Sequence, residues 1–255
     1  MFAQVEFPPI ENIVEWPNWF GGDSILGFNK IAFISLIAFV VPVILFLVAG
    51  AKYKSRFVPT GVQTITESAV DFIDRQVILP TIGANGASFL PLLVSMFFFI
   101  FVCNLFEIIP TSHMPANARM ANPLMLALTS WLVFIGVGIK RHGPKYFIDT
   151  IKPPGVPFAL LFLVMPIEFI SKFLLRPFSL AVRLFANMLA GHILLVTFSV
   201  LTITLWTPSL LALAWPFAFG MLIIFTGFEL MVAFLQAYIF TLLTAVYIGD
   251  SIHSH

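Results

Sequence analysis

Charge and cysteine are both scarce in this sequence. Only 10% of its 255 residues are charged, and a formal net charge of +1 gives no basic surface for nucleic acid. Cys103 is the single cysteine, which excludes an intrachain disulfide and a cysteine-based zinc site, and we expect its thiol to pack in the interior. The sequence also has no Walker loop and no HExxH motif. We therefore expect no cofactor, no metal and no catalytic nucleotide site in this chain.

Apolar residues, in contrast, make up 60% of the chain, with 30 phenylalanines and a mean hydropathy of +1.01. A soluble domain cannot bury that much apolar surface, so the composition predicts an integral membrane protein. Soluble enzymes are excluded, and an intramembrane enzyme is disfavoured because no nucleophile–base pair or metal cluster stands out. We predict an all-α polytopic membrane protein with about five transmembrane helices and one amphipathic surface helix.

The hydropathy pattern divides this single membrane domain, residues 1–255, into five parts. They are an acidic and aromatic external tail (1–28), a first span (31–51), a surface helix (61–79), a helical hairpin (88–139) and a long tilted helix pair (156–249). Basic residues follow the first span and the hairpin, namely Lys52, Lys54, Arg56, Lys140, Arg141 and Lys145. Since such residues mark the cytoplasmic side, the N-terminus is expected outside and the C-terminus in the cytoplasm.

The surface helix is predicted from its helical spacing of apolar residues. Its apolar face is expected to contain Val62, Ile65, Ala69, Phe72, Ile73 and Gln76. Asp71 and Arg75 stand four residues apart on the polar side, where they can form an ion pair.

The two final apolar runs, 156–206 and 208–249, are longer than a perpendicular span requires. About 40 helical residues reach roughly 60 Å, twice the thickness of the hydrocarbon core. These helices must therefore tilt steeply, run along the membrane or break. They also carry nearly all of the intramembrane charge.

Arg183 is the most unusual residue, because it lies within the apolar stretch PFSLAVRLFANMLAGHILLVTF. A guanidinium stays charged, and placing it at mid-bilayer costs about 2.5 to 17 kcal/mol, so it marks a functional site. No carboxylate lies within one helical turn in sequence, so its partner comes from elsewhere. Helical spacing puts Asn187 and Ala190 on its face, with Ala186 beside them, and Ser179 and Arg176 extend that face backwards.

A second polar line follows the last helix, where Glu229, Ala233 and Gln236 share one stripe. His192 points away from Arg183, so it can meet Glu229 inside the protein, although a histidine here can also be a packing residue. Other polar residues have similar alternatives. Asn104 can simply bridge helices, Glu107 can lie at the membrane interface, and Lys172 and Arg176 can reach lipid headgroups.

The motif SLAVRLFANMLAGH, followed by ELMVAFLQAYIFTLLTAVYI, resembles the a subunit of F-type ATP synthases, of the bacterial type related to mitochondrial subunit 6. The resemblance covers essentially the whole chain. It implies that Arg183 is the family's essential arginine, with Asn187 and Gln236 as polar neighbours. His192 and Glu229 match a pair that some relatives carry in exchanged order. The segments CNLFEIIP and PIEFIS add further proton-translocation candidates, namely Asn104, Glu107, Glu168 and Ser171.

That resemblance implies a non-catalytic, ion-translocating stator subunit with two offset proton half-channels. Its implied partners are a ring of c subunits with buried carboxylates, the b subunits of the peripheral stalk, the lipid bilayer and, indirectly, the F1 sector. The implied location is the bacterial plasma membrane in preference to the mitochondrial inner membrane. The alternative is a stand-alone secondary transporter in which Arg183 binds an anionic substrate, although the sequence shows no internal repeat.

Overall fold

The computed structural model describes residues 29–53, 61–109, 116–152, 158–206 and 210–253. The predicted external tail, 1–28, and the basic residues Lys54 and Arg56 lie outside these ranges. Within them every regular element is helical. The long helices are α2 (Lys30–Tyr53), α3 (Val62–Ile73), α5 (Leu90–Ile108), α6 (Ala121–His142), α8 (Phe158–Phe169), α9 (Arg176–Leu205) and α10 (Trp215–His253).

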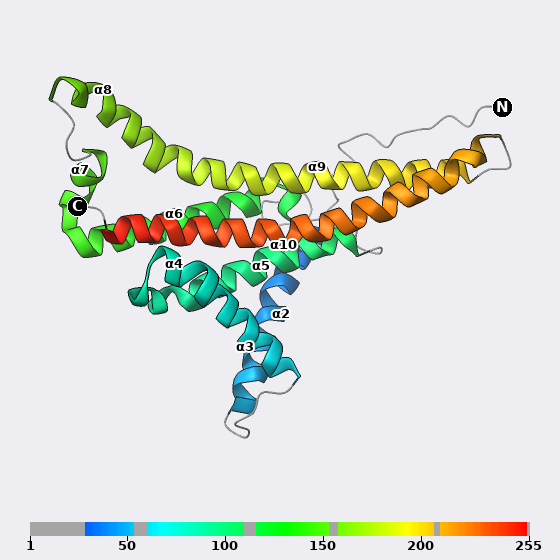
Figure 1. Ribbon diagram of the computed structural model, residues 1–255, viewed down its shortest axis with the longest axis horizontal. Helices are drawn as coiled ribbons and strands as arrows, with labels where there is room; N and C mark the ends of the chain where they lie inside the picture. The colour runs from blue at the N-terminus through cyan, green and yellow to red at the C-terminus, as the bar shows by residue number, and fades with distance from the viewer. Residues whose placement is uncertain (1–28, 54–60, 110–115, 153–157, 207–209, 254–255) are drawn as a thin grey trace.

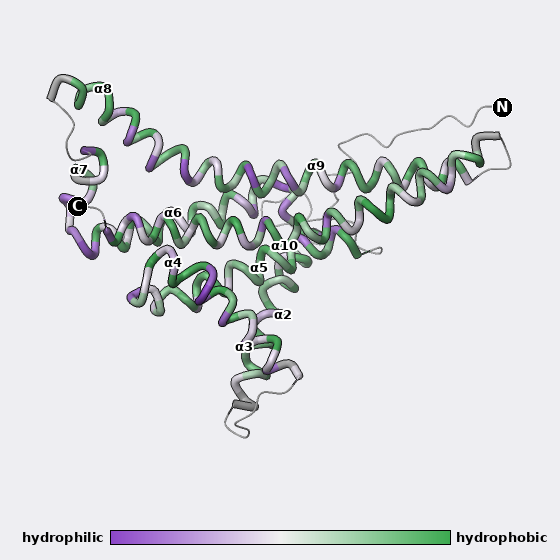
Figure 2. The backbone as a smooth tube through the Cα atoms, in the orientation of Figure 1, coloured by the Kyte–Doolittle hydropathy of each residue, from purple (hydrophilic) through white to green (hydrophobic). Residues whose placement is uncertain are grey.

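The predicted all-α membrane fold is confirmed. Five described segments are long and apolar enough to cross a membrane, namely Lys30–Gly50, Ala84–Ile108, Ala121–Ile148, Leu160–Leu205 and Ala212–His253. Large apolar side chains also point outward, among them Leu47, Phe162 and Phe217. Figure 2 shows hydrophobic residues around much of each long helix instead of along one buried stripe. Such surfaces suit hydrocarbon as the surrounding solvent.

Helix α10 is the centre of the packing, with α5, α6 and α9 against it (Figure 1). Helices α9 and α10 run antiparallel. Phe198 contacts Phe225 near one end with ring centroids 4.8 Å apart, and Arg176 lies over the ring of Tyr247 near the other, 4.7 Å from its centroid. At 1.5 Å per residue, the 46 residues of Leu160–Leu205 extend about 70 Å, so this segment cannot stand upright in roughly 30 Å of hydrocarbon.

The segment before α9 contains a π-helical stretch, η5 (Ile170–Leu175), which ends just before Pro177. A proline has no N–H to donate to the carbonyl four residues earlier, which here belongs to Phe173. The indole Nε1 of Trp131 in α6 donates to that carbonyl oxygen at 3.0 Å. The hydrogen bond that the helix loses is thus replaced by one that ties α6 to it.

The surface helix is also found, as α3 followed by the π-helical η1 (Asp74–Ile78) and α4 (Leu79–Thr81). Its predicted apolar face is partly wrong. Ile65 and Gln76 are exposed, whereas the buried residues are Gln63, Thr66, Ile73, Val77 and Ile78. Gln63, Thr66, Ile73 and Val77 still recur at helical spacing, so the buried side is regular but is rotated by about 90° from the predicted one. Packing against α2, α5 and α10 selects this side.

Candidate functional site

Arg183 lies on an open side of α9, together with Ala186, Asn187 and Ala190. All four are exposed, and their spacing of three, four and seven residues places them on one face. None of the ion pairs between described residues involves Arg183. Helix α9 forms an edge of the molecule in Figure 1, with α6 and α10 on its inner side. The guanidinium is therefore presented beside small side chains that permit another helix to approach closely.

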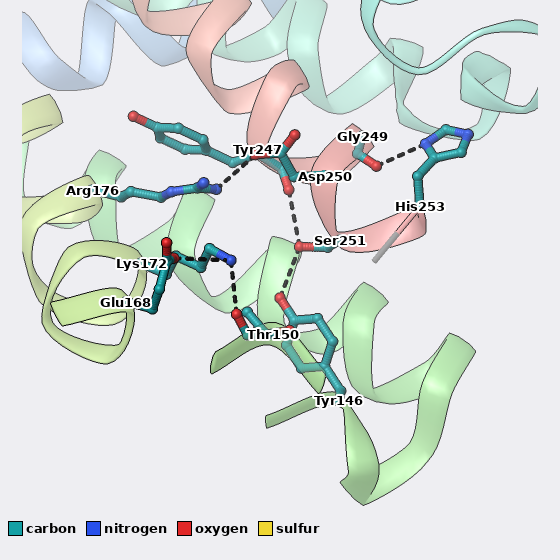
Figure 3. A network of polar contacts seen from close by, with 10 residues as sticks. All are labelled: Tyr146, Thr150, Glu168, Lys172, Arg176, Tyr247, Gly249, Asp250, Ser251 and His253. Carbon is teal, nitrogen blue, oxygen red and sulfur yellow. Dashed lines mark hydrogen bonds and ion pairs between the residues drawn. The ribbon is translucent and has the colours of Figure 1, made fainter. Parts of the chain in front are cut away.

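Arg176 does not extend this open face, contrary to the expectation from helical spacing. Its Nη1 lies 3.0 Å from Oδ2 of Asp250, and its guanidinium stacks over Tyr247 (Figure 3). The side chain of Arg176 is therefore held against α10 by these two contacts. Arg176 ties the start of α9 to the end of α10, and it is not a free headgroup anchor.

The predicted stripe on α10 is present and faces the interior. Glu229, Ala233 and Gln236 are all buried. A β-carbon added at Gly191 of α9 would collide with the carboxyl atoms of Glu229. The next residue, His192, is buried as well. The tertiary structure thus brings His192 and Glu229, which are 37 positions apart in sequence, to adjoining places on two packed helices.

Asn104 and Glu107 of α5 belong to the same buried region. The Nδ2 of Asn104 donates to the carbonyl oxygen of Ala233 at 3.4 Å, in the middle of the α10 stripe. Glu107 lies one turn further along α5 and close enough to Glu229 for their charges to interact. Asn104 and Glu107 are both almost fully buried, so Glu107 is not a lipid-interface residue.

Asn117 is a member of this cluster that the sequence analysis did not identify. It lies in the short turn η3 (Ala116–Ala118), which packs against α9 and α5. Its Nδ2 donates to Oδ1 of Asn104 at 2.7 Å, and its side chain is fully buried. The surrounding sequence PANARMAN has no helical or strand periodicity that could have marked the residue.

Three buried oxygens in this region have no hydrogen-bond donor among the described residues. They are Oε1 of Glu107, Oε2 of Glu229 and Oδ1 of Asn117. A buried acceptor without a donor is costly, and such groups usually bind water or a proton. The region, which we call the buried acceptor cluster (Asn104, Glu107, Asn117, Glu229), can therefore take up water or protons at membrane depth.

Glu168 and Ser171 lie apart from that cluster, near the C-terminal end of α10. The Oε2 of Glu168 lies 3.1 Å from Nζ of Lys172, which also donates to the carbonyl oxygen of Thr150 at 2.7 Å. Ser171 is half-buried in η5. Tyr146 and Ser251 share a hydrogen bond of 2.9 Å nearby (Figure 3). Lys172 is therefore paired within the protein. The polar residues around it form a second polar group, apart from the buried acceptor cluster.

A packed apolar layer separates the two polar groups along α9 and α10. It consists of Leu184, Met188, Ala237 and Phe240, all buried. Arg183 lies at this level, seven residues beyond Arg176 and nine before His192, which is about 10 and 14 Å along the helix axis. Asn187 is at the same level but faces outward, so the structure does not group it with His192, Glu229 and Gln236.

Two hollows lie elsewhere in the described structure. One, of about 490 Å³, has an apolar lining from α2, α3 and α5, and its neighbour is lined by polar residues of α3. None of the candidate residues lines either hollow. In the described portion no three His, Cys, Asp or Glu side chains are grouped as metal ligands. Cys103 is buried in the packing of α2 and α5, as expected.

Comparison with known proteins identifies the family. Residues 32–249 match the family model described as ATP synthase A chain. ATP synthase subunit a of Frankia alni is 40% identical over 253 residues, covering 95% of this chain and 85% of that protein. The same subunit of Rhodococcus erythropolis is 43% identical over 239 residues, covering 89% and 83%. That of a Parafrankia species is 45% identical over 209 residues, covering 79% and 69%. With a family match over most of its length and helices fit to span a bacterial membrane, the chain belongs to the ATP synthase subunit a family.

Proposed function

We propose that this chain is the ion-translocating stator subunit in the membrane sector of an F-type ATP synthase. In this proposal two proton half-channels enter from opposite sides of the membrane and end at a ring of c subunits, each with a buried carboxylate. The chain itself has no catalytic role. The observation that carries the proposal is the exposed Arg183, held at the level of an apolar layer with a polar group on either side.

The buried acceptor cluster and His192 form the wall of the external half-channel in this proposal. The support is the set of donor-free oxygens on Glu107, Glu229 and Asn117, which require water or protons as partners. Gln236 continues the stripe from Glu229 towards the level of Arg183, and Asn187 meets the rotor beside it. Protons that reach this level can then pass to a rotor carboxylate at the open face of α9.

Glu168, Ser171 and Lys172 form the start of the cytoplasmic half-channel. The support is their position at the end of the molecule where Lys140 and Arg141 are exposed at the end of α6. Trp206 and Trp215 are paired at the opposite end of the α9–α10 pair, with ring centroids 4.9 Å apart. Basic residues favour the cytoplasmic side and tryptophans favour an interface, which agrees with a cytoplasmic C-terminus in the plasma membrane.

Arg183 is proposed to separate the two half-channels electrostatically. A rotor carboxylate in lipid is neutral because removal from water disfavours its charged form, and it ionises when it meets the guanidinium. Arginine suits this position because it keeps its proton, so it cannot itself conduct protons across the apolar layer. Each proton that crosses 100 mV releases about 2.3 kcal/mol, and a leak at this point would lose that energy without turning the rotor.

The surface helix α3 is proposed to dock the peripheral stalk of b subunits, and through it to connect indirectly with F1. Its support is an exposed polar side, on which Asp71 and Arg75 form an ion pair of 2.7 Å. The torque that the rotor exerts on this subunit must be resisted by such a contact outside the hydrocarbon.

The test is proton flux in vesicles that contain the intact complex with Arg183→Lys or Arg183→Ala. The lysine variant should lose ATP-driven pumping, because an ammonium lacks the planar fork and can release its proton. The alanine variant should also lose coupled transport and should gain passive proton leakage. Arg141→Ala, which removes an exposed arginine at the end of α6, is the matched control and should pump normally. Full coupled pumping by Arg183→Ala would overturn the proposal.

A further inference from the structure

We infer that Asn117, from the turn between α5 and α6, is a positioning residue of the external proton path. The inference deepens the proposed function and rests on it. Hydrogen bonds in the buried acceptor cluster fix the orientation of the side-chain amides of Asn104 and Asn117. Asn117 is the residue that holds Asn104 in its orientation.

The orientation of Asn104 follows from its two partners. The carbonyl oxygen of Ala233 can only accept, so the Nδ2 of Asn104 must face α10, at 3.4 Å. The Oδ1 of Asn104 therefore faces the turn, where the Nδ2 of Asn117 donates to it at 2.7 Å. If Asn117 reversed its amide, two acceptor oxygens would meet, which is unfavourable.

The same geometry leaves the oxygen of Asn117 without a partner among the described residues. Since its Nδ2 is used by Asn104, its Oδ1 must point to the other side, and it has no donor there among the described residues. The side chain is fully buried, so bulk solvent does not satisfy this oxygen. An isolated water or a hydrated proton can do so. Glu107 and Glu229 lie one helical turn from Asn104 and Ala233, and their donor-free oxygens can bind the same species.

Asn117 consequently acts in two ways. It holds Asn104 against Ala233, one helical turn from Glu229, and so fixes the α10 stripe relative to α5. It also offers an acceptor that orients water between the turn and the two carboxyl groups. Asn117 itself does not take up the transported proton, because a neutral amide is a poor base.

The experiment measures passive proton conduction through vesicles stripped of F1, normalised to the amount of assembled complex. Asn117→Leu keeps the branched shape of the side chain and removes both polar atoms. We expect conduction to fall by about fivefold, the factor that corresponds to one ordinary hydrogen bond. Asn104→Ala should cause a similar loss. The double variant should lose little more than either single variant, because the two residues act through one hydrogen bond.

Ser35→Ala, in α2 beside the same turn, is the matched control. Ser35 accepts a hydrogen bond of 2.8 Å from Asn122, which also donates to the carbonyl of Ala116, the neighbour of Asn117. This change loosens the turn without touching the cluster and should leave conduction per complex unchanged.

Two results would overturn the inference. One is normal conduction per assembled complex in Asn117→Leu, which would show that the residue only packs. The other is full additivity of the Asn104 and Asn117 losses. Glu229→Gln is measured in parallel. If it lowers conduction while Asn117→Leu does not, the inference alone fails; if Glu229→Gln conducts normally, the external path assigned under the proposed function fails instead.

Discussion

At the scale of single residues, Gly191 makes room for the buried pair of His192 and Glu229. Because a β-carbon there would collide with the carboxyl of Glu229, only glycine allows that carboxyl to lie against α9 beside His192. Gly191 and His192 are both buried in α9. The role of this pair in transport is a prediction, and its geometry suggests how to test it.

We predict that His192 and Glu229 function as a pair. Single neutral replacements, His192→Ala and Glu229→Gln, should each slow ATP-driven proton transport. The exchanged variant, His192→Glu with Glu229→His, should recover part of the loss, because it restores one acidic and one imidazole group in the same space. The measurement is the initial rate of acidification in vesicles with equal amounts of complex. An exchanged variant no better than the worse single variant would show that the residues are not paired.

At the scale of elements, the surface helix combines two differently packed halves. Its first half buries polar residues, Gln63 and Thr66, on the side where α3 packs against α2. Its second half buries Ile73, Val77 and Ile78. A β-carbon at Gly249 of α10 would meet the backbone oxygen of Thr81, so the end of this segment also approaches α10 closely. The helix is anchored at both ends, and its charged side remains exposed.

We predict that this exposed side assembles with the peripheral stalk. Reversing both charges, Asp71→Arg with Arg75→Asp, retains the ion pair within α3, and an exposed pair contributes at most about 1 kcal/mol to stability. The double variant should therefore fold normally, assemble less complex and conduct protons normally per assembled complex. The measurement compares the amount of b subunit retained on purification with the conduction rate.

Replacing the buried side of the helix provides the contrasting case. Ile73→Ala with Val77→Ala should lower both folded subunit and assembly, since removing buried methyl groups costs about 1–5 kcal/mol per site. Normal assembly of both sets of variants would argue that the surface helix does not dock the stalk.

At the scale of the whole molecule, one side of α9 has no partner among the residues that the structure describes. Arg183, Ala186, Asn187 and Ala190 are exposed there, although a charge facing lipid would be unfavourable. Under the proposed function, we therefore expect another membrane protein to cover this open face. A secondary transporter would instead enclose such an arginine in a site between its own helices.

We predict that the subunit migrates with a large assembly after purification in a mild detergent. Replacing the small residues of the open face, Ala186→Leu with Ala190→Leu, should weaken its association with the c ring, because bulky side chains prevent close helix approach. Leu163→Ala, an exposed residue of α8 away from this face, is the control. Native gel mobility and c-subunit recovery provide the readout. Migration of the unchanged protein as a monomer or small oligomer would favour the transporter alternative.

The sequence by itself was sufficient for the membrane class, the five spans and the length of the last two helices. It also singled out Arg183, whose role stays a prediction. Hydropathy adds up along a segment, and a guanidinium in an apolar run is costly in any arrangement, so neither inference requires the fold. Helical spacing also placed Glu229, Ala233 and Gln236 on one stripe, because α10 is regular over its whole length.

Only the tertiary structure decided which side of the surface helix is buried and which distant residues meet. Packing against α2, α5 and α10 turned Gln63 and Val77 inward and left Ile65 and Gln76 outward, about 90° from the face that the apolar pattern predicts. Arg176 left the predicted face because Asp250 and Tyr247, on another helix, attract it. Asn117 joined the cluster through a hydrogen bond that no periodicity encodes. The local sequence pattern indicates whether a segment prefers water or hydrocarbon. The contacts that its side chains make with other helices depend on how the whole chain packs.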